Sequence, residues 1–322
     1  MFNFTIQPAF TERVNVDESK VYEILIIGGG PSGLNAALYA SRKGRDVAIL
    51  AKRVGGQLLN TSSVENYLGK DGSSGEELTE AFRSHVESLK VPILEDAEIR
   101  KLEKTDGIFH VLLGDGRRFK GKTVILNLGT TNRKLNIPGE DTFASKGIAY
   151  CAICDAPLYK GKDVLLAGGG NSAVEAAIDV AKVAKTVTVI HRSEFRADKI
   201  LVDKLYEMKN ITVHLQTQIL EAVGDQRLTG VRVLDKRTME ERIIHGDGLF
   251  IEIGNDPNTS LVKDLVDLNA SGEVIVDNKA RTSLEGLYAA GDMAETPYKQ
   301  IIIAAASGAI AALAANEYLN TI

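Results

Sequence analysis

Two cysteines lie close together near the middle of the sequence. Cys151 and Cys154 are the only cysteines in 322 residues, and Asp155 follows them directly. A CxxC spacing suits either half of a zinc site or a thiol pair that forms and breaks a disulfide. Zinc needs four ligands, but the chain has no second CxxC, and its histidines are scattered at His85, His110, His191, His214 and His245. The pattern therefore favours a redox dithiol.

Disulfide exchange requires one thiolate that attacks and a second thiol that resolves the mixed disulfide. The CxxC spacing keeps both thiols within bonding reach. Exchange also moves protons, and Asp155 is the nearest carboxylate that could carry one. An aspartate at this place is also typical of a turn or helix cap, so both interpretations stay open.

Bulk composition narrows the function classes. The net charge of −5 argues against a nucleic-acid-binding chain, because phosphate contacts need a basic face. The first 20 residues lack a cationic start, an apolar core and a small-residue cleavage site, so we expect no secretory signal and a cytoplasmic protein. The apolar run from Ile301 to Ala315 is shorter than the roughly 20 residues of a membrane span, which predicts a buried helix and no membrane partner.

The sequence contains an internal repeat. A stretch that begins "YEILIIGGGPSG" at Tyr22 matches a second that begins "KDVLLAGGGNSA" at Lys162. The glycine positions keep a constant offset of 140 residues: Gly28, Gly30 and Gly33 in the first copy, Gly168, Gly170 and Ala173 in the second. Each copy predicts a strand, a glycine turn, an Ala-rich helix and a second strand.

This context is typical of dinucleotide binding. The first glycine makes the turn, the second lets the backbone approach a pyrophosphate, and the third position packs helix against strand. The phosphates then lie at the helix N-terminus, where free N–H groups favour anions. Two such units predict two dinucleotides.

The end of the second strand distinguishes the two nucleotides, since an acid there binds a ribose hydroxyl and arginines accept a 2′-phosphate. In the second copy His191, Arg192 and Arg196 occupy this place and favour NADPH, although NADH stays possible and the charges could be solvated surface residues. In the first copy Ala51 and Lys52 stand where the acid is expected. A flavin is the usual intermediary between a nicotinamide and a dithiol, which predicts FAD for the first unit.

The combination resembles the low-molecular-weight, bacterial-type thioredoxin reductases of the flavoprotein pyridine nucleotide-disulfide oxidoreductase family. The resemblance runs from about Tyr22 to Leu319. It rests on these stretches in this order: "GGGPSGLNAALYASR", "GGQLLNTSSVENYLG", "CAICD", "GGGNSAVEAA", "HRSEFRA", "IGNDPNT" and "GLYAAGDMAETPYKQIIIAAASGAIAA".

The resemblance implies an α/β protein with two Rossmann-like, three-layer β/β/α domains. Residues 1–147 and 278–322 would form a discontinuous FAD domain, and residues 148–277 an inserted NAD(P)H domain that carries the CxxC. The activity implied is NADPH-dependent reduction of a thioredoxin or thioredoxin-like disulfide by way of the flavin. The family also implies a homodimer.

The resemblance further implies residue roles. Cys154 would face the flavin as the charge-transfer thiol, Cys151 would attack the partner disulfide, and Asp155 would shuttle the proton. The FAD residues would be Gly28, Gly30, Pro31, Ser32, Gly33, Gly56, Gln57, Leu58, Asn66, Gly129, Gly291, Asp292, Gln300 and Ile301. The NADPH residues would be Gly168, Gly170, Asn171, Ser172, Ala173, His191, Arg192 and Arg196.

Some stretches depart from the family pattern. Ser193 replaces the usual second arginine, and Asn127-Leu128 replace the first two residues of the usual "ATG". The continuation Ala156-Pro157-Leu158 and the tail "TPYKQIIIA" are nearer to the flavoprotein component of alkyl hydroperoxide reductase. Alternative functions are a dithiol oxidase, a related flavoenzyme fed by ferredoxin or NADH, and a flavin-binding redox sensor.

Overall fold

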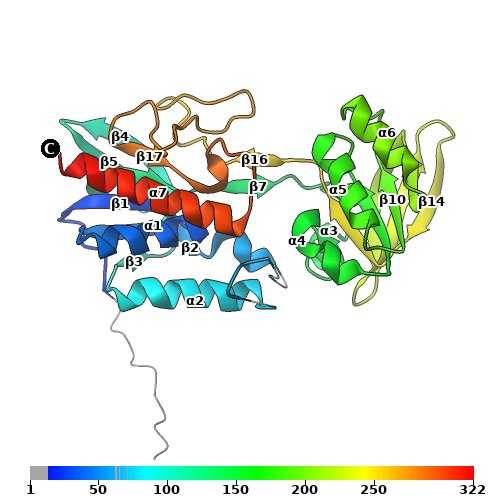
Figure 1. Cartoon of the computed structure of the whole chain (residues 1–322), viewed down its shortest axis with the longest axis horizontal. Coiled ribbons are helices and arrows are strands. Elements are labelled where there is room, and N and C mark those ends of the chain that lie inside the picture. The colour runs from blue at the N-terminus through cyan, green and yellow to red at the C-terminus, as the bar shows by residue number, and fades with distance from the viewer. Residues whose placement is uncertain (1–13, 62–63, 65, 71) are drawn as a thin grey trace, which may run out of the picture. The chain divides into compact units, whose positions relative to one another are not determined.

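The computed structural model describes residues 14–61, 64, 66–70 and 72–322 (Figure 1). The N-terminal stretch on which the secretory-signal prediction rests therefore lies largely outside the described residues. The chain folds into two compact units. The first comprises the described parts of Met1–Thr61, Tyr67–Thr131 and Pro257–Ile322, and the second comprises those of Ser62–Asn66 and Asn132–Asp256.

These bounds differ from the predicted domain bounds at 147/148 and 277/278. Residues 132–147 belong to the second unit because Phe143 is buried among its strands. Residues 257–277 belong to the first unit because Val262, Val266 and Val274 are buried in its core. Which nucleotide each unit takes stays a prediction.

The first unit is built on a sheet with strand order β3-β2-β1-β6-β5-β4, with β17 also pairing β6. Its strands are β1 (Val21–Gly29), β2 (Val47–Val54), β3 (Ile93–Leu94), β4 (Ile99–Thr105), β5 (Ile108–Leu113), β6 (Arg118–Leu126) and β17 (Leu287–Ala289). The pairs β1–β2, β1–β6, β2–β3 and β6–β17 are parallel, and the β4–β5 and β5–β6 pairs are antiparallel. The central strand β1 is apolar on both faces, as a parallel strand covered on both sides must be.

Helices cover one face of this sheet, and on the other face its own end strands β5 and β4 pack together with residues 262–274. The helices are α1 (Pro31–Arg42), α2 (Gly75–Ser88), α7 (Ile301–Leu319) and the short 3₁₀ segments η1 (Gly56–Asn60) and η3 (Gly291–Met293). Ile24 and Ile26 of β1 pack toward α1 and α7, whereas Leu25 and Ile27 pack toward the β4–β5 ribbon. This alternation follows from the two-residue period of a strand and gives three layers.

The second unit repeats the plan. Its parallel sheet has the order β11-β10-β9-β15-β8, and a separate antiparallel sheet has the order β12-β13-β14. The strands are β8 (Ile148–Ala149), β9 (Asp163–Ala167), β10 (Thr186–Ile190), β11 (Ile211–His214), β12 (Thr217–Gly224), β13 (Leu228–Asp235), β14 (Glu240–His245) and β15 (Gly248–Ile251). The helical segments are α3 (Glu140–Phe143), α4 (Ala152–Asp155), η2 (Ala156–Tyr159), α5 (Asn171–Ala181) and α6 (Lys199–Glu207).

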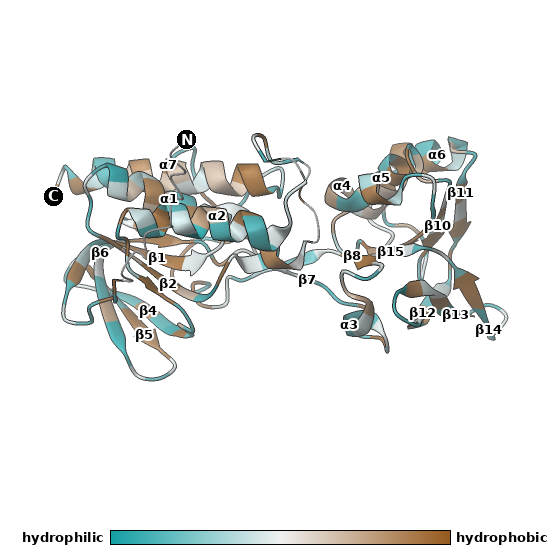
Figure 2. Cartoon of the chain, turned by 90° about the horizontal axis from the view of Figure 1, so that it is seen from below, coloured by the Kyte–Doolittle hydropathy of each residue, from teal (hydrophilic) through white to brown (hydrophobic). Residues whose placement is uncertain are grey.

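Side chains again alternate between two cores. Val164 and Leu166 of β9 pack toward the helices, and Leu165 packs toward the antiparallel sheet. Apolar strands such as β10 appear brown in Figure 2. The predicted α/β fold with two Rossmann-like regions is confirmed. The strands β7 (Thr130–Asn132) and β16 (Asn255–Pro257) pair with each other where the chain passes between the units.

Helix α7 is the helix of the described chain that is long and apolar enough to cross a membrane, and 44% of its apolar window is buried. Its alanines, including Ala311 and Ala315, pack in one cluster with Ala36 and Ala40 of α1. This packing is typical of a core helix and agrees with the predicted buried helix.

Core packing of the second unit gives a first prediction. Phe250 on β15 is fully buried, and its ring lies 5.1 Å from that of Tyr159, centroid to centroid. Phe250→Ala should lower the free energy of unfolding by about 3–5 kcal/mol, because loss of the ring leaves a cavity that the surrounding packed side chains can fill only in part. Urea unfolding of the intact chain measures this. Ile243→Ala, at a side chain that is 51% exposed, is the control and should change it by less than about 0.5 kcal/mol; equal losses would contradict the burial.

Candidate functional site

Each glycine turn is fixed by one close contact between backbones. Gly28 has φ +113°, and a methyl group added to it would lie 2.2 Å from the carbonyl oxygen of Asn127, just after β6. Gly168 has φ +156°, and a methyl group there would lie 2.3 Å from the carbonyl oxygen of Glu252, just after β15. Only glycine fits these positions, so the first glycine of each motif serves the turn.

The second glycine of each motif faces open space. Gly30 and Gly170 are the N-caps of α1 and α5, neither cap has a side-chain hydrogen bond, and an added methyl group would meet no atom within 4 Å. The N–H groups in the first turn of each helix therefore face open space, and the side chain of any other residue at the second glycine would begin to fill that space. Both turns fit the pyrophosphate of a dinucleotide.

The third position packs helix against strand in both copies. A methyl group on Gly33 would lie 2.0 Å from the carbonyl oxygen of Gly28. In the second copy Ala173 is buried, and its Cβ would lie 2.5 Å from a methyl group on Gly168. The neighbouring Pro31 is at the start of α1, where its missing N–H costs no hydrogen bond.

Ser32 is the point where three segments meet in the first unit. Its hydroxyl donates to Asn127 Oδ1 at 2.5 Å, so the unusual asparagine of the "NLG" turn holds the start of α1. A methyl group on Gly308 of α7 would lie 2.0 Å from the Ser32 carbonyl oxygen, and one on Gly291 would lie 3.0 Å from its Cβ. Gly291 therefore lies next to the glycine turn at the start of α1.

Asp292 follows Gly291 and is largely buried. Burial raises the pKa of its carboxyl group, and the positive charge of Lys299 opposes this only in part. No group of the described chain donates a hydrogen bond to it. A buried acceptor without a donor fits a ligand hydroxyl, as the resemblance to flavoproteins implies.

The remaining predicted FAD residues are placed as follows. Gln57 Nε2 donates to the carbonyl and hydroxyl oxygens of Thr130 at 2.5 and 2.9 Å, and so links η1 to the segment that contains Gly129. Gly56 and Leu58 lie on the same η1 segment, while Gln300 and Ile301 are the N-cap and first residue of α7. Asn66 lies in the short segment grouped with the second unit, so its place beside these residues stays a prediction.

The loop after β10 is folded against the second glycine turn. A methyl group on Gly169 would lie 2.3 Å from the His191 ring, and the Arg196 N–H donates to the Gly169 carbonyl oxygen at 2.8 Å. Burial lowers the pKa of His191, and the charges of Arg196 and Arg192 lower it further. Both guanidiniums are exposed and therefore free to meet an anionic group at this turn.

Two more predicted residues begin α5. Asn171 donates from Nδ2 to the Asp198 carboxylate at 2.9 Å, and the Asp198 N–H donates to Asn171 Oδ1 at 2.8 Å. This reciprocal pair ties the glycine turn to the start of α6. Ser172 is exposed in the first turn of α5.

Cys151 and Cys154 form a disulfide, with Cα atoms 5.3 Å apart. Cys151 is the N-cap of the one-turn helix α4, and the Cys154 N–H donates to its sulfur at 3.3 Å. The disulfide was expected from the spacing and fits a redox-active pair.

Asp155 is partly buried at the end of α4, and its N–H donates to the Cys151 carbonyl oxygen at 3.1 Å. Burial raises the pKa of Tyr159, and the charge of Asp155 raises it further. The backbone of Asp155 thus closes the turn of the dithiol, which is the structural role that the sequence allowed. The proton-transfer role stays a prediction.

Sequence reasoning missed Glu252. Its carboxylate accepts the N–H of Ala152, between the two cysteines, at 2.9 Å, and burial raises its pKa to about 7. The signal was a single acid in the apolar run "LFIEI", at a place where burial on both faces predicts another hydrophobic residue.

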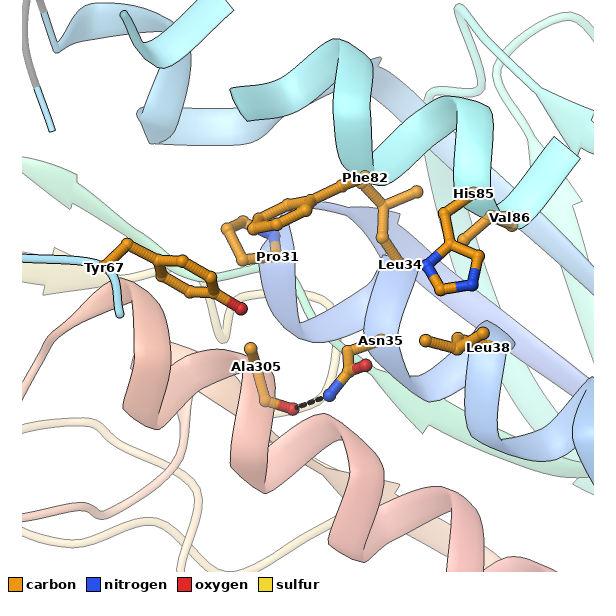
Figure 3. Close-up of a pocket in the computed structure, with 9 residues that line it drawn as sticks. All are labelled: Pro31, Leu34, Asn35, Leu38, Tyr67, Phe82, His85, Val86 and Ala305. Carbon is orange, nitrogen blue, oxygen red and sulfur yellow. Dashed lines mark hydrogen bonds between the residues drawn. The ribbon is translucent and has the colours of Figure 1, made fainter. Parts of the chain in front are cut away.

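Among the described residues no group of three or more histidine, cysteine or acidic side chains could hold a metal. A pocket of about 40 Å³ lies between α1, α2 and α7 (Figure 3). Phe82 and Tyr67 line it, and the Asn35 amide donates to the Ala305 carbonyl oxygen at 2.7 Å beside it. Its volume suits about one or two waters rather than a nucleotide, and Pro31 alone connects it with the predicted FAD residues.

Two dinucleotide-type turns and a CxxC disulfide in one chain define a disulfide oxidoreductase. The chain belongs to the pyridine nucleotide-disulphide oxidoreductase family, whose model matches residues 22–308. Membership implies a flavin and a nicotinamide nucleotide.

Similar proteins agree with this assignment. An NADH dehydrogenase of Bacillus subtilis is 42% identical over 96% of the chain and 61% of the relative, and the F component of the alkyl hydroperoxide reductase of Staphylococcus aureus is 40% identical over 94% and 60%. The crystal structure of thioredoxin reductase from Streptococcus pyogenes is 37% identical over 94% of this chain and 99% of that one, with a TM-score of 0.89. The chain spans about three fifths of the length of the two curated relatives.

The two kinds of glycine give a second prediction. Gly30→Ala should leave the free energy of unfolding within about 1 kcal/mol of wild type but remove the bound flavin, because the methyl group fills only the phosphate gap. Gly28→Ala should destabilise the fold itself, since its methyl group would overlap the Asn127 carbonyl. Flavin absorbance per chain, read beside urea unfolding, separates the two effects. Full flavin content in Gly30→Ala would contradict the assignment.

Proposed function

We propose that the protein is a flavin-dependent reductase that passes electrons from NADPH, through FAD and the Cys151–Cys154 pair, to the disulfide of a thioredoxin or thioredoxin-like protein. The observation that carries this proposal is the disulfide at the start of α4 in a chain with two open glycine turns. The similarity to a thioredoxin reductase along 99% of that chain supports it.

The first unit would hold FAD and the second unit NADPH. Gly30 would admit the FAD pyrophosphate, and Asp292 would accept a hydrogen bond from a hydroxyl of its ribityl chain. Gly170 would admit the second pyrophosphate, and Arg192 and Arg196 would meet the 2′-phosphate. When bound, the flavin converts a hydride into the two electrons that reduce a disulfide.

The two cysteines would have different roles. Cys154 would face the flavin, Cys151 would attack the partner disulfide, and Asp155 would transfer the proton, as the family resemblance implies. Cys151 is the N-cap of α4, where its sulfur already accepts an N–H; the same donor would stabilise a thiolate.

The partner is proposed by its chemistry, an exposed disulfide in a thioredoxin-like protein. The similarity to a component of alkyl hydroperoxide reductase supports a peroxidase system as one setting for such a partner. A homodimer in the cytoplasm completes the proposal. A chromogenic disulfide assay with NADPH and candidate thioredoxins tests it: absence of turnover in a protein that retains its flavin would reject it.

NADH is the second candidate donor. It is favoured by the serine at position 193 and by the relative named NADH dehydrogenase. Anaerobic titration of the flavin spectrum with each nicotinamide decides between the two. Absence of bleaching by either would instead favour the ferredoxin-fed or dithiol-oxidase alternatives.

Removing one thiol should separate the two half-reactions. In Cys154→Ser, flavin reduction by the nicotinamide should persist, whereas disulfide turnover should fall roughly a thousandfold or more, because no dithiol can form. Rapid-mixing absorbance follows the first half-reaction and the chromogenic assay the second. Disulfide turnover near the wild-type rate would show that the pair is not the redox centre.

The arginines should determine nicotinamide preference. Arg192→Ala combined with Arg196→Ala should raise KM for NADPH about ten- to a hundredfold and leave KM for NADH nearly unchanged, because charge-assisted bonds to the 2′-phosphate are lost. Lys182→Ala, at the C-terminal end of α5, removes an exposed cation as the matched control. Equal changes for both nucleotides would contradict the assignment.

A further inference from the structure

Glu252 is an acid that the proposed relay does not use. It directly follows β15, and its backbone is held from two sides, because its N–H donates to the Ala167 carbonyl oxygen at 2.8 Å and its own carbonyl oxygen lies against Gly168. Because the backbone is held in place, the side chain of Glu252 starts from a defined position. From there the carboxylate reaches the N–H of Ala152 at 2.9 Å.

The hydrogen bond places the carboxylate beside the dithiol. The Ala152 N–H belongs to the peptide bond that joins it to Cys151, and Cys154 is two residues further along the same helical turn. Burial raises the pKa of Glu252 to about 7, and within the described chain no charged side chain is among the causes of that shift. The carboxyl group is therefore charged in part of the protein at neutral pH.

Other titratable side chains are carried by the neighbouring segments, and none of them is among the causes of the Glu252 pKa shift. The active-site segment carries Tyr150, Cys151, Cys154 and Asp155, and α5 carries the exposed Glu175. Near Gly254, Arg133 and Asp256 pair with each other at 2.6 Å. The group that changes charge during the reaction and lies next to Glu252 is the cysteine pair.

We propose that Glu252 is a positioning residue of the redox disulfide: its carboxylate holds the amide that follows Cys151, and its negative charge disfavours a thiolate on the reduced pair. This inference rests on the redox role of the disulfide and goes beyond the assignment of nicotinamide and partner. The reduction potential of the cysteine pair then depends on whether Glu252 is protonated.

The chemical step balances with a dithiol such as dithiothreitol as reductant. Two electrons break the Cys151–Cys154 bond, and dithiothreitol closes to its cyclic disulfide and releases two protons. Of the two thiolates formed, one takes the first proton and becomes a thiol; the second proton goes to the Glu252 carboxylate while the other cysteine stays a thiolate. Like charges close together disfavour each other, so reduction and protonation of Glu252 are coupled.

The test is an equilibrium titration of the holoenzyme in dithiothreitol buffers from pH 5.5 to 9. Alkylation of free thiols gives the reduced fraction directly, since the chain has two cysteines only. The titration needs neither nicotinamide nor thioredoxin, so it stays valid if the proposed donor or partner is wrong. Wild type and variant are compared in the same buffers, which cancels the pH dependence of dithiothreitol itself.

Glu252→Gln keeps an acceptor for the Ala152 N–H and removes the charge. At pH 6 its equilibrium constant for reduction should match wild type, and at pH 8.5 it should be about tenfold larger, which is about 30 mV for two electrons. Glu175→Gln removes an exposed carboxylate from the adjacent helix α5 and should show no pH-dependent change.

Two outcomes would overturn the proposal. The first is an equilibrium constant for reduction that is the same in Glu252→Gln and wild type at pH 8.5. The second is a ratio of the two constants that is the same at every pH, which a purely structural role of Glu252 would give. The wild-type protein supplies an independent measurement: its potential should fall more steeply above pH 7 than below, because one more proton accompanies the electrons. A constant slope would reject the proposal even if the variant failed to fold.

Discussion

The contact between a glycine and the carbonyl oxygen of the neighbouring strand end is the constraint on which both units depend. Gly28 meets Asn127 in this way, and Gly168 meets Glu252. Because no side chain fits between these backbones, the chain turns sharply from strand to helix and leaves the helix N-terminus open. The nucleotide sites, the helix packing and the position of the second strand all follow from that turn.

The same backbone position has been used differently in the two copies. Asn127 directs its side chain to Ser32 and so supports the glycine turn of its own unit. Glu252 directs its side chain to Ala152 and so reaches the disulfide. A structural repeat therefore provides two equivalent positions, and the side chain at each decides whether it contacts the glycine turn or the segment that carries the disulfide.

Much of this arrangement could be predicted from sequence because local rules determine it. The glycine spacing demands a turn before a helix, the β-branched runs demand buried strands, and the CxxC spacing brings two sulfurs into bonding range. The boundaries of the units could not be predicted as well. In the sequence, Phe143 and Val262 are both apolar residues in short stretches rich in polar residues, and only packing shows that they belong to different cores.

The sequence by itself determined the fold class, the two glycine turns and the disulfide, because each depends on residues close together in the chain. The tertiary structure alone decided what lies against them: His191 on Gly169, Gly308 on Ser32 and Glu252 on Ala152. The last of these pairs is separated by 100 residues, and its energetics depend on burial. Burial is a property of the packed chain, so no reading of neighbouring residues could have assigned Glu252 its pKa of about 7.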